Sequence, residues 1–203
     1  MKIVIIIHYN PFYSNTAEAN RWRTLIEGLE KLEALIKIVI TSGYHDKEEK
    51  LQFGLSGVHQ NIEYIYLNNV LVDTIWKKRY HNYIGKKINI NRLKNKVQQE
   101  LIGLNGIAWV ANDLYIWKAL YNIPQRAFKL FTEVSEFLDT HKYNNYTKLQ
   151  KWEGDKRQIF FETYFLDQLD GLALMTKTLI KHYQSFSKHP PLVAIPDYRR
   201  DFS

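Results

Sequence analysis

Short apolar runs recur along the chain, and amphipathic or polar stretches separate them. The run Ile3–Ile7 consists only of β-branched residues, which is typical of a central parallel strand covered on both faces. Residues 62–67 alternate apolar and polar side chains, as expected of a strand with one buried face. Further apolar runs predict strands at residues 35–41, 107–110, 127–131, 172–175 and 192–195.

The stretches between these runs show helical spacing. One helical face is formed by Trp22, Leu25, Ile26, Leu29 and Leu32. Asn15 and Glu18 are three residues apart, a spacing that predicts a capping box at the start of this helix. Helices are also predicted at residues 90–101, 114–121 and 148–168, and after Thr176.

Two segments interrupt the alternation. Residues 44–60 are polar and punctuated by glycine, which predicts a loop or irregular insert. Residues 70–83 have only rough helical spacing and stay ambiguous. Everywhere else strands and helices alternate, so we predict one domain over residues 1–203. Its expected fold class is α/β, a Rossmann-like, doubly wound, mostly parallel sheet with helices on both faces.

Composition and charge narrow the range of functions. The 203 residues include no cysteine, which excludes disulfides, thiolate metal sites and a cysteine nucleophile. No apolar run approaches the roughly 20 residues of a membrane-spanning helix. The net charge of +7 suits an anionic partner such as nucleic acid, phosphate groups or anionic lipid, but a solvated basic surface explains it equally well. The basic residues are spread out, and no nucleic-acid-binding motif accompanies them.

Candidate binding residues follow the first predicted strand. Ligands of a doubly wound sheet bind outside the carboxyl ends of its strands. The first loop brings His8, Asn10, Ser14, Asn15 and Thr16 to that edge and leads into a helix amino terminus, which favours an anion such as phosphate. The alternatives are that the loop residues only cap the helix, and that His8 is satisfied by its neighbours.

Other strand ends supply the opposite wall. Asn112 and Asp113 follow one predicted strand and are candidates for substrate binding. Glu133 and Glu136 follow another, three residues apart, and are candidates for a general base or a hydroxyl acceptor. A helix cap or a salt bridge is the alternative role for these glutamates.

Several catalytic motifs are absent from the sequence. It contains no G-x-x-x-x-G-K-[ST], no G-x-G-x-x-G after the first strand, no H-E-x-x-H and no G-x-S-x-G. The seven histidines are scattered, which argues against a zinc site. A complete small enzyme of another reaction class is therefore disfavoured.

Four segments, in this order and spacing, resemble the amino-terminal acceptor domain of family 4 glycosyltransferases, which have GT-B architecture. They are KIVIIIHYNPFYSNTAEANRWRTLIEGLEKL (2–32), FTEVSEF (131–137), LDGLALMTKTLIKHY (169–183) and AIPDYRRDF (194–202). One departure is that Ser14-Asn15-Thr16 stands where many relatives have a glycine pair.

The resemblance implies a retaining glycosyltransferase that uses a nucleotide sugar as donor and needs no metal or other cofactor. Its second domain, which holds most of the donor site, is expected beyond Ser203, so this part alone is expected to be inactive. The implied acceptor is a glycan or lipid-linked glycan of bacterial surface polysaccharide or glycolipid synthesis. The expected location is the cytoplasm. Residues 76–87 either contact the inner face of the membrane or form a solvated helix face, and the solvated face is the favoured alternative. The alternative function is a non-enzymatic basic module that binds nucleic acid or another polyanion.

Overall fold

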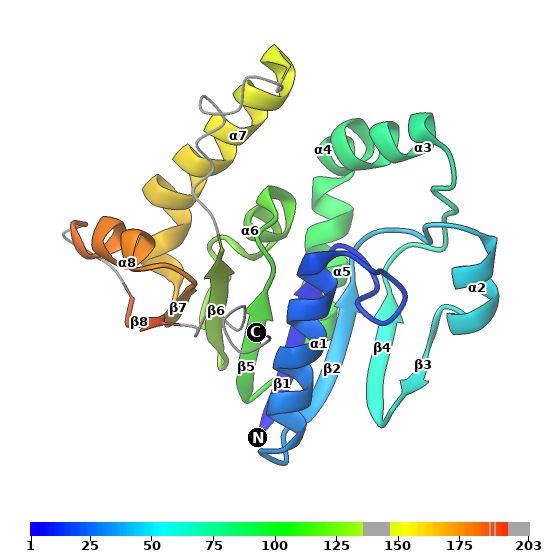
Figure 1. The fold of residues 1–203 in the computed structure, drawn as a ribbon, viewed down its shortest axis with the longest axis horizontal. Helices are drawn as coiled ribbons and strands as arrows, with labels where there is room; N and C mark the ends of the chain where they lie inside the picture. Colours follow the sequence, from blue (N-terminus) through cyan, green and yellow to red (C-terminus); the bar gives the residue numbers. More distant parts are fainter. Residues whose placement is uncertain (136–146, 187, 189, 195–203) are drawn as a thin grey trace, which may run out of the picture.

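The computed structural model describes residues 1–135, 147–186, 188 and 190–194 (Figure 1). Their strands form one sheet in the order β3-β4-β2-β1-β5-β6-β7-β8. All neighbouring strands are parallel except β3 and β4, which are antiparallel. The strands are β1 (Lys2–Ile7), β2 (Leu35–Ile40), β3 (Ser56–His59), β4 (Ile62–Tyr66), β5 (Gly106–Val110), β6 (Lys129–Val134), β7 (Gly171–Leu174) and β8 (Leu192–Ala194).

Helices connect the parallel strands. They are α1 (Ala17–Glu30), α2 (Lys47–Phe53), α3 (Ile75–Arg79), α4 (Lys86–Ile88), α5 (Ile90–Leu101), α6 (Leu114–Leu120), α7 (Lys148–Phe160) and α8 (Lys177–Gln184). A π-helical segment, Tyr80–Gly85, joins α3 to α4, and a second one, Phe161–Phe165, continues α7. No helix in the described part of the chain combines the length and the apolar character that crossing a bilayer requires.

Two hydrophobic cores cover the two faces of the sheet. On one face, alternate residues of β1 such as Ile5 pack with Trp22 and Ile26 of α1. On the other face, Ile6 belongs to a core that includes Val97 of α5 and Trp117 of α6. Figure 1 shows α1 in front of the sheet and α5 behind it. Because β1 is buried on both sides, its run of β-branched residues needs no polar face, and the predicted fold class is confirmed.

The strand order reverses at β1. From β1 the chain continues through β2 to β4 on one side, and then returns to add β5 on the other side. Such a reversal opens a crevice outside the carboxyl ends of the central strands, where ligands bind in this fold class. The residues that follow β1 and β2 lie at this edge.

The segment 44–60 was wrongly predicted as a loop or irregular insert. It contains α2 and β3, and β3 pairs with β4 through a turn in which Gln60 and Asn61 have φ of 50° and 68°. The helix is only seven residues long and is stabilised by Asp46, whose side chain accepts a hydrogen bond from the Glu49 amide. Short elements of this kind have too few residues for a periodic pattern to emerge.

Two local predictions at the ends of elements also need correction. Thr16, rather than Asn15, is the N-cap of α1, because its hydroxyl accepts from the Ala19 amide at 3.2 Å. Glu133 lies inside β6, whereas the sequence placed it after a strand ending at Phe131. The ambiguous stretch 70–83 contains α3 and most of the first π-helical segment.

Candidate functional site

A polar cavity of about 550 Å³ lies at the carboxyl edge of the sheet, next to the ends of β1 and β2. We call it the polar cavity. Its lining residues come from the first loop, the start of α1, the segment after β2 and the start of α2. They are His8, Tyr9, Asn10, Tyr13, Ser14, Asn15, Thr16, Glu18, Ser42, Gly43, His45, Asp46, Glu49 and Val72. The cavity thus contains every binding residue predicted in the first loop, whereas Asn112 and Asp113 are not part of its wall.

Asn10 shapes the turn that enters the cavity. Its side-chain oxygen accepts from the Phe12 amide at 2.9 Å, and its side-chain nitrogen donates to the Tyr66 hydroxyl at 2.7 Å. Asn10 is only 2% exposed, so it links the first loop to β4. This role is chiefly that of a positioning residue for the loop.

Glu49 is the buried carboxylate of this wall, and the sequence did not single it out. It is 3% exposed, accepts from the Tyr66 hydroxyl at 2.8 Å and also accepts from the His45 amide. Burial raises the pKa of Glu49, and these two hydrogen bonds oppose the rise. Its only sequence signal was a glutamate in a polar stretch, which is normally solvated.

Asp46 and Tyr13 also line the polar cavity and contact each other. The Tyr13 hydroxyl lies 2.9 Å from both carboxylate oxygens of Asp46. The pKa of Asp46 is lowered, first because the Glu49 amide donates to it. The hydrogen bond that the Tyr13 hydroxyl donates to Asp46 raises the pKa of Tyr13 to about 12. Asp46 therefore stays ionised and Tyr13 stays protonated over the physiological range.

Glu133 forms an ion pair beside the polar cavity. The Nε and one terminal nitrogen of Arg21 both donate to Oε1 of Glu133, at 3.0 and 2.6 Å. Glu133 is 2% exposed, and burial raises its pKa although Arg21 opposes the rise. The salt bridge that the sequence left open as an alternative is present. Glu136, the other predicted catalytic residue, lies outside the described residues.

Glu18 connects this ion pair to the polar cavity. Burial raises the pKa of Glu18, Arg21 opposes that rise, and the charges of Glu133 and Asp113 add to it. Burial and the neighbouring Glu18 carboxylate likewise raise the pKa of Tyr9. Elements α1 and β6 thus bring the carboxyl groups of Glu18 and Glu133 close to the guanidinium of Arg21. Carboxyl oxygens accept hydrogen bonds from hydroxyl groups, and a guanidinium donates to them.

Asn112 and Asp113 have separate roles at the end of β5. Asp113 is the N-cap of α6, since its Oδ1 accepts from the Tyr115 and Ile116 amides at 2.8 and 3.1 Å. The Oδ1 atom of Asn112 is buried and has no hydrogen-bond partner among the described residues. Such an acceptor is unfavourable unless a ligand or solvent donor reaches it.

The amino terminus of α1 is partly occupied by its own loop. The Thr16 hydroxyl caps the helix and lies 3.3 Å from the Ser14 hydroxyl. Arg23 donates to the Ser14 carbonyl at 2.8 Å and also to the Pro11 carbonyl, which fixes the loop against α1. Within the described ranges, no group of three or more histidine, aspartate or glutamate side chains gathers in a metal-binding arrangement.

Comparison with known proteins identifies the fold through structure alone. No protein-family model matches the chain, and no curated protein matches it in sequence. Among solved structures, apo UGT2 of Phytolacca americana superposes with a TM-score of 0.58 over 96% of this chain, at 8% identity. A UGT transferase from Siraitia grosvenorii in complex with UDP gives a TM-score of 0.52, also over 96% of this chain and at 8% identity. The chain has a glycosyltransferase-type fold.

The superposition covers only part of each structural neighbour. The match covers 52% of the Phytolacca chain and 51% of the Siraitia chain. The chain therefore spans about half the length of the solved structures it matches. At 8% identity the likeness concerns the fold, and it transfers no residue roles.

Proposed function

We propose that this chain is the acceptor-binding part of a nucleotide-sugar-dependent glycosyltransferase. The observation that carries the proposal is the polar cavity at the carboxyl edge of a glycosyltransferase-type sheet, beside the point where the strand order reverses. A cavity of about 550 Å³ is large enough for a small glycan portion of an acceptor.

The side chains of the polar cavity suit a polyhydroxylated ligand. Ionised Asp46 and the Glu49 carboxyl group offer acceptors for sugar hydroxyls, while the Ser14 hydroxyl and the Asn15 side-chain amide offer donors. Near the cavity, Glu133 and Glu18 have raised pKa values, which brings a carboxylate closer to the basicity that proton abstraction at neutral pH requires. In this proposal Glu133 and Glu136 are the catalytic pair, and the residues of the first loop with Asn112 and Asp113 bind the acceptor.

The donor nucleotide sugar binds mainly to a second domain in this proposal. Two facts support that division: the chain spans about half of its structural neighbours, and one neighbour is a complex with UDP. The family 4 resemblance of the four sequence segments further supports a retaining, metal-independent reaction in bacterial surface polysaccharide or glycolipid synthesis. The chain without the second domain would then bind acceptor and transfer nothing.

The proposed location is the cytoplasm, with contact to the inner face of the membrane through residues 76–87. Trp76 is 77% exposed, and Lys77 and Lys87 are exposed near it in sequence. Each basic residue near an anionic membrane surface contributes about 1 kcal/mol.

The proposal is tested by acceptor binding to the chain, using saturation-transfer NMR with a panel of neutral oligosaccharides. The substitution Glu49→Gln is expected to weaken binding about tenfold, because it changes a buried hydrogen-bonding group in the cavity wall. Glu48→Gln, at the exposed neighbouring position, is the matched control and should leave binding unchanged.

Transfer is tested separately with nucleotide-linked sugars. The chain alone should release no nucleotide in the presence of acceptor and UDP-, GDP- or ADP-linked hexoses. The natural reading frame should continue past Ser203 into a second α/β domain of about 150–200 residues, and the longer protein should release nucleotide. A stop codon there, with no neighbouring gene for the second half, together with no glycan binding by the chain, would contradict the proposal.

A further inference from the structure

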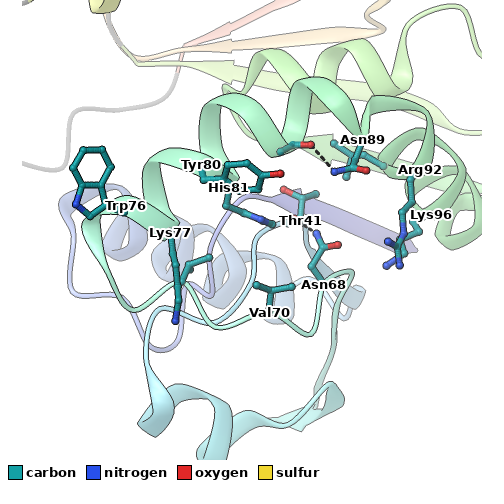
Figure 2. A pocket seen from close by; sticks show the side chains of 13 residues that line it. Thr41, Asn68, Val70, Trp76, Lys77, Tyr80, His81, Asn89, Arg92 and Lys96 are labelled. Carbon is teal, nitrogen blue, oxygen red and sulfur yellow. Dashed lines mark hydrogen bonds between the residues drawn. The ribbon is translucent and has the colours of Figure 1, made fainter.

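A second cavity, of about 480 Å³, lies beside the polar cavity under the segment from α3 to α5 (Figure 2). We call it the basic cavity. Its charged lining residues are the cations Lys77, Arg92 and Lys96, and none of the described residues that line it is a carboxylate. Polar groups are supplied by Thr41, Asn68 and Asn89, among others.

A thin wall separates the two cavities. The Tyr44 amide donates to the Val70 carbonyl, and the Val72 amide donates to the Tyr44 carbonyl, each at 2.8 Å. Gly43 packs so closely against Val70 that a Cβ there would lie 2.0 Å from the Val70 carbonyl oxygen. Val72 lines both cavities. A ligand in one cavity is therefore a short distance from the other.

The floor of the basic cavity contains an unused hydroxyl. Thr41 is 1% exposed, and its Oγ1 has no hydrogen-bond partner among the described residues. The neighbouring Asn68 side chain donates to the Thr41 carbonyl at 2.8 Å, which holds Asn68 at the cavity floor. In Figure 2, Thr41 and Asn68 lie across the cavity from the helical segment that carries Tyr80 and His81. A buried hydroxyl without a partner costs about 1–3 kcal/mol, so this one is suited to a ligand.

Two of the three cations that line the basic cavity have no carboxylate partner among the described residues. Arg92 and Lys96 lie one helical turn apart on α5, and the described residues include no carboxylate paired with either. Lys96 donates to the Leu67 carbonyl. Burial and the charge of Arg92 lower the pKa of Lys96. Lys77 differs, because it pairs with Asp73 at 2.8 Å. An anion bound between Arg92 and Lys96 would offset the repulsion between these two positive charges.

The aromatic rim indicates what else the anion carries. Trp76 and Tyr80 line the basic cavity and are 77% and 58% exposed. Exposed aromatic side chains offer flat apolar faces to a ring. Arginine, lysine, amide and hydroxyl donors together match the oxygens of a phosphate group.

We propose that the basic cavity binds the phosphate group of a ring-bearing acceptor, whose sugar portion extends past Val72 into the polar cavity. This inference rests on the proposed function, because it names the class of acceptor. The phosphate belongs either to a soluble sugar phosphate or to a lipid-linked one, and the chemistry of recognition is the same for both.

The test is calorimetric titration of the chain with glucose 6-phosphate, with glucose as the uncharged control. Saturable binding is expected for glucose 6-phosphate, and glucose, which lacks the phosphate, is expected to bind at least about tenfold more weakly. The double substitution Arg92→Gln with Lys96→Gln should weaken binding at least about tenfold, and Thr41→Val should weaken it several-fold. Lys94→Gln on the same helix, outside the cavity wall, is the matched control and should bind like the wild type. Arg92→Gln alone, at an exposed position, keeps the test valid if the Lys96 substitution disturbs folding.

A second arm identifies the source of the phosphate. Vesicles of phosphatidylcholine with and without phosphatidylglycerol are tested against the same variants. Retention on the anionic vesicles that is lost in the double variant, but kept in Lys94→Gln, would assign the phosphate to a lipid. The inference would be overturned if Lys94→Gln lost as much binding of both probes as the double variant does. It would also be overturned if glucose and glucose 6-phosphate bound equally well.

The two proposals fail in different ways. Binding of glucose 6-phosphate that depends on Arg92, without glycosyl transfer by the longer protein, would leave the phosphate site and remove the proposed function. Transfer by the longer protein, without phosphate binding in this cavity, would leave the function and remove the phosphate site.

Discussion

Glu49 and Glu133 are carboxylates that the fold buries almost completely, and they are stabilised in different ways. Glu133 has a charged partner, Arg21, whereas Glu49 relies on the Tyr66 hydroxyl and the His45 amide. Burial is the largest cause of the raised pKa in both. Each of these carboxylates should affect both the free energy of unfolding and the proposed binding or catalysis, and each can be substituted separately.

Removing Arg21 should leave Glu133 buried without its partner. We expect Arg21→Met to lower the free energy of unfolding by about 2–3 kcal/mol, which is below the cost for a fully buried pair because Arg21 is partly exposed. Adding Glu133→Gln should recover part of the loss, and urea unfolding of the four proteins in the cycle measures the coupling. A cost for Arg21→Met no larger than that of the exposed Lys31→Gln control would show that the pair contributes nothing.

Glu49 should make stability depend on pH. Its pKa is raised in the folded state, so the folded protein binds the proton more tightly than the unfolded chain does. The stability from this residue is present below its unfolded pKa, near 4.5, and is lost as the pH rises through the folded pKa. Glu49→Gln should remove that loss. Chemical unfolding of both proteins at pH values from about 4 to 8 measures it, and parallel pH profiles would contradict the expectation.

At the scale of elements, helix starts bring polar side chains to the carboxyl edge of the sheet. Thr16, Asp46 and Asp113 are the N-caps of α1, α2 and α6. Each hydrogen-bonds to backbone amides of its own helix, so capping and ligand binding compete for the same oxygens. From the sequence alone, a polar residue after a strand can therefore be either a helix cap or a ligand-binding residue. Both roles were considered for the first loop.

Asp113 allows capping to be separated from acceptor binding. Asp113→Ala should cost about 1 kcal/mol of stability because α6 loses its cap, whereas Asp113→Asn should cost little because asparagine caps equally well. If Asp113 binds the acceptor as proposed, the asparagine variant should bind more weakly at nearly unchanged stability. Thermal unfolding and the NMR binding assay together distinguish the roles, and equal acceptor affinity in Asp113→Asn would leave Asp113 only as a cap.

At the scale of the whole molecule, some basic side chains are neutralised by carboxylates and others are not. The net charge is +7, yet Lys37, Lys77 and Lys129 are paired with carboxylates. Arg92 and Lys96 line a cavity instead of spreading over a flat face. This arrangement suits one compact anion better than an extended polyanion.

Binding to nucleic acid should accordingly be weak and sensitive to salt. For a 20-base-pair duplex we expect a Kd above about 1 μM at 150 mM salt, and we expect this Kd to rise steeply as the salt concentration increases. Fluorescence anisotropy at several salt concentrations measures this. Tight binding of the duplex at 150 mM salt that Arg92→Gln does not change would favour the alternative function, a basic module for polyanions.

The sequence by itself determined the strands and the longer helices, because each depends on a local period. The β-branched run of β1 and the apolar face of α5 can be recognised in the sequence without knowing which elements pack against them. Parallel topology followed from the alternation, and so did the expectation that the first loop lies at a ligand-binding edge. The short α2 and β3 were missed, since their stability comes from a cap and a hairpin partner.

Only the tertiary structure decided which side chains meet. Arg21 and Glu133 are 112 residues apart in the chain, and Asn10 meets Tyr66 across 56. These contacts depend on the strand order, which no local pattern encodes. The same holds for the wall between the two cavities, where Tyr44 pairs with Val70 and Val72. Hydrophobic periodicity reports which face of an element is buried, whereas the partner it is buried against is set by how all the elements pack together.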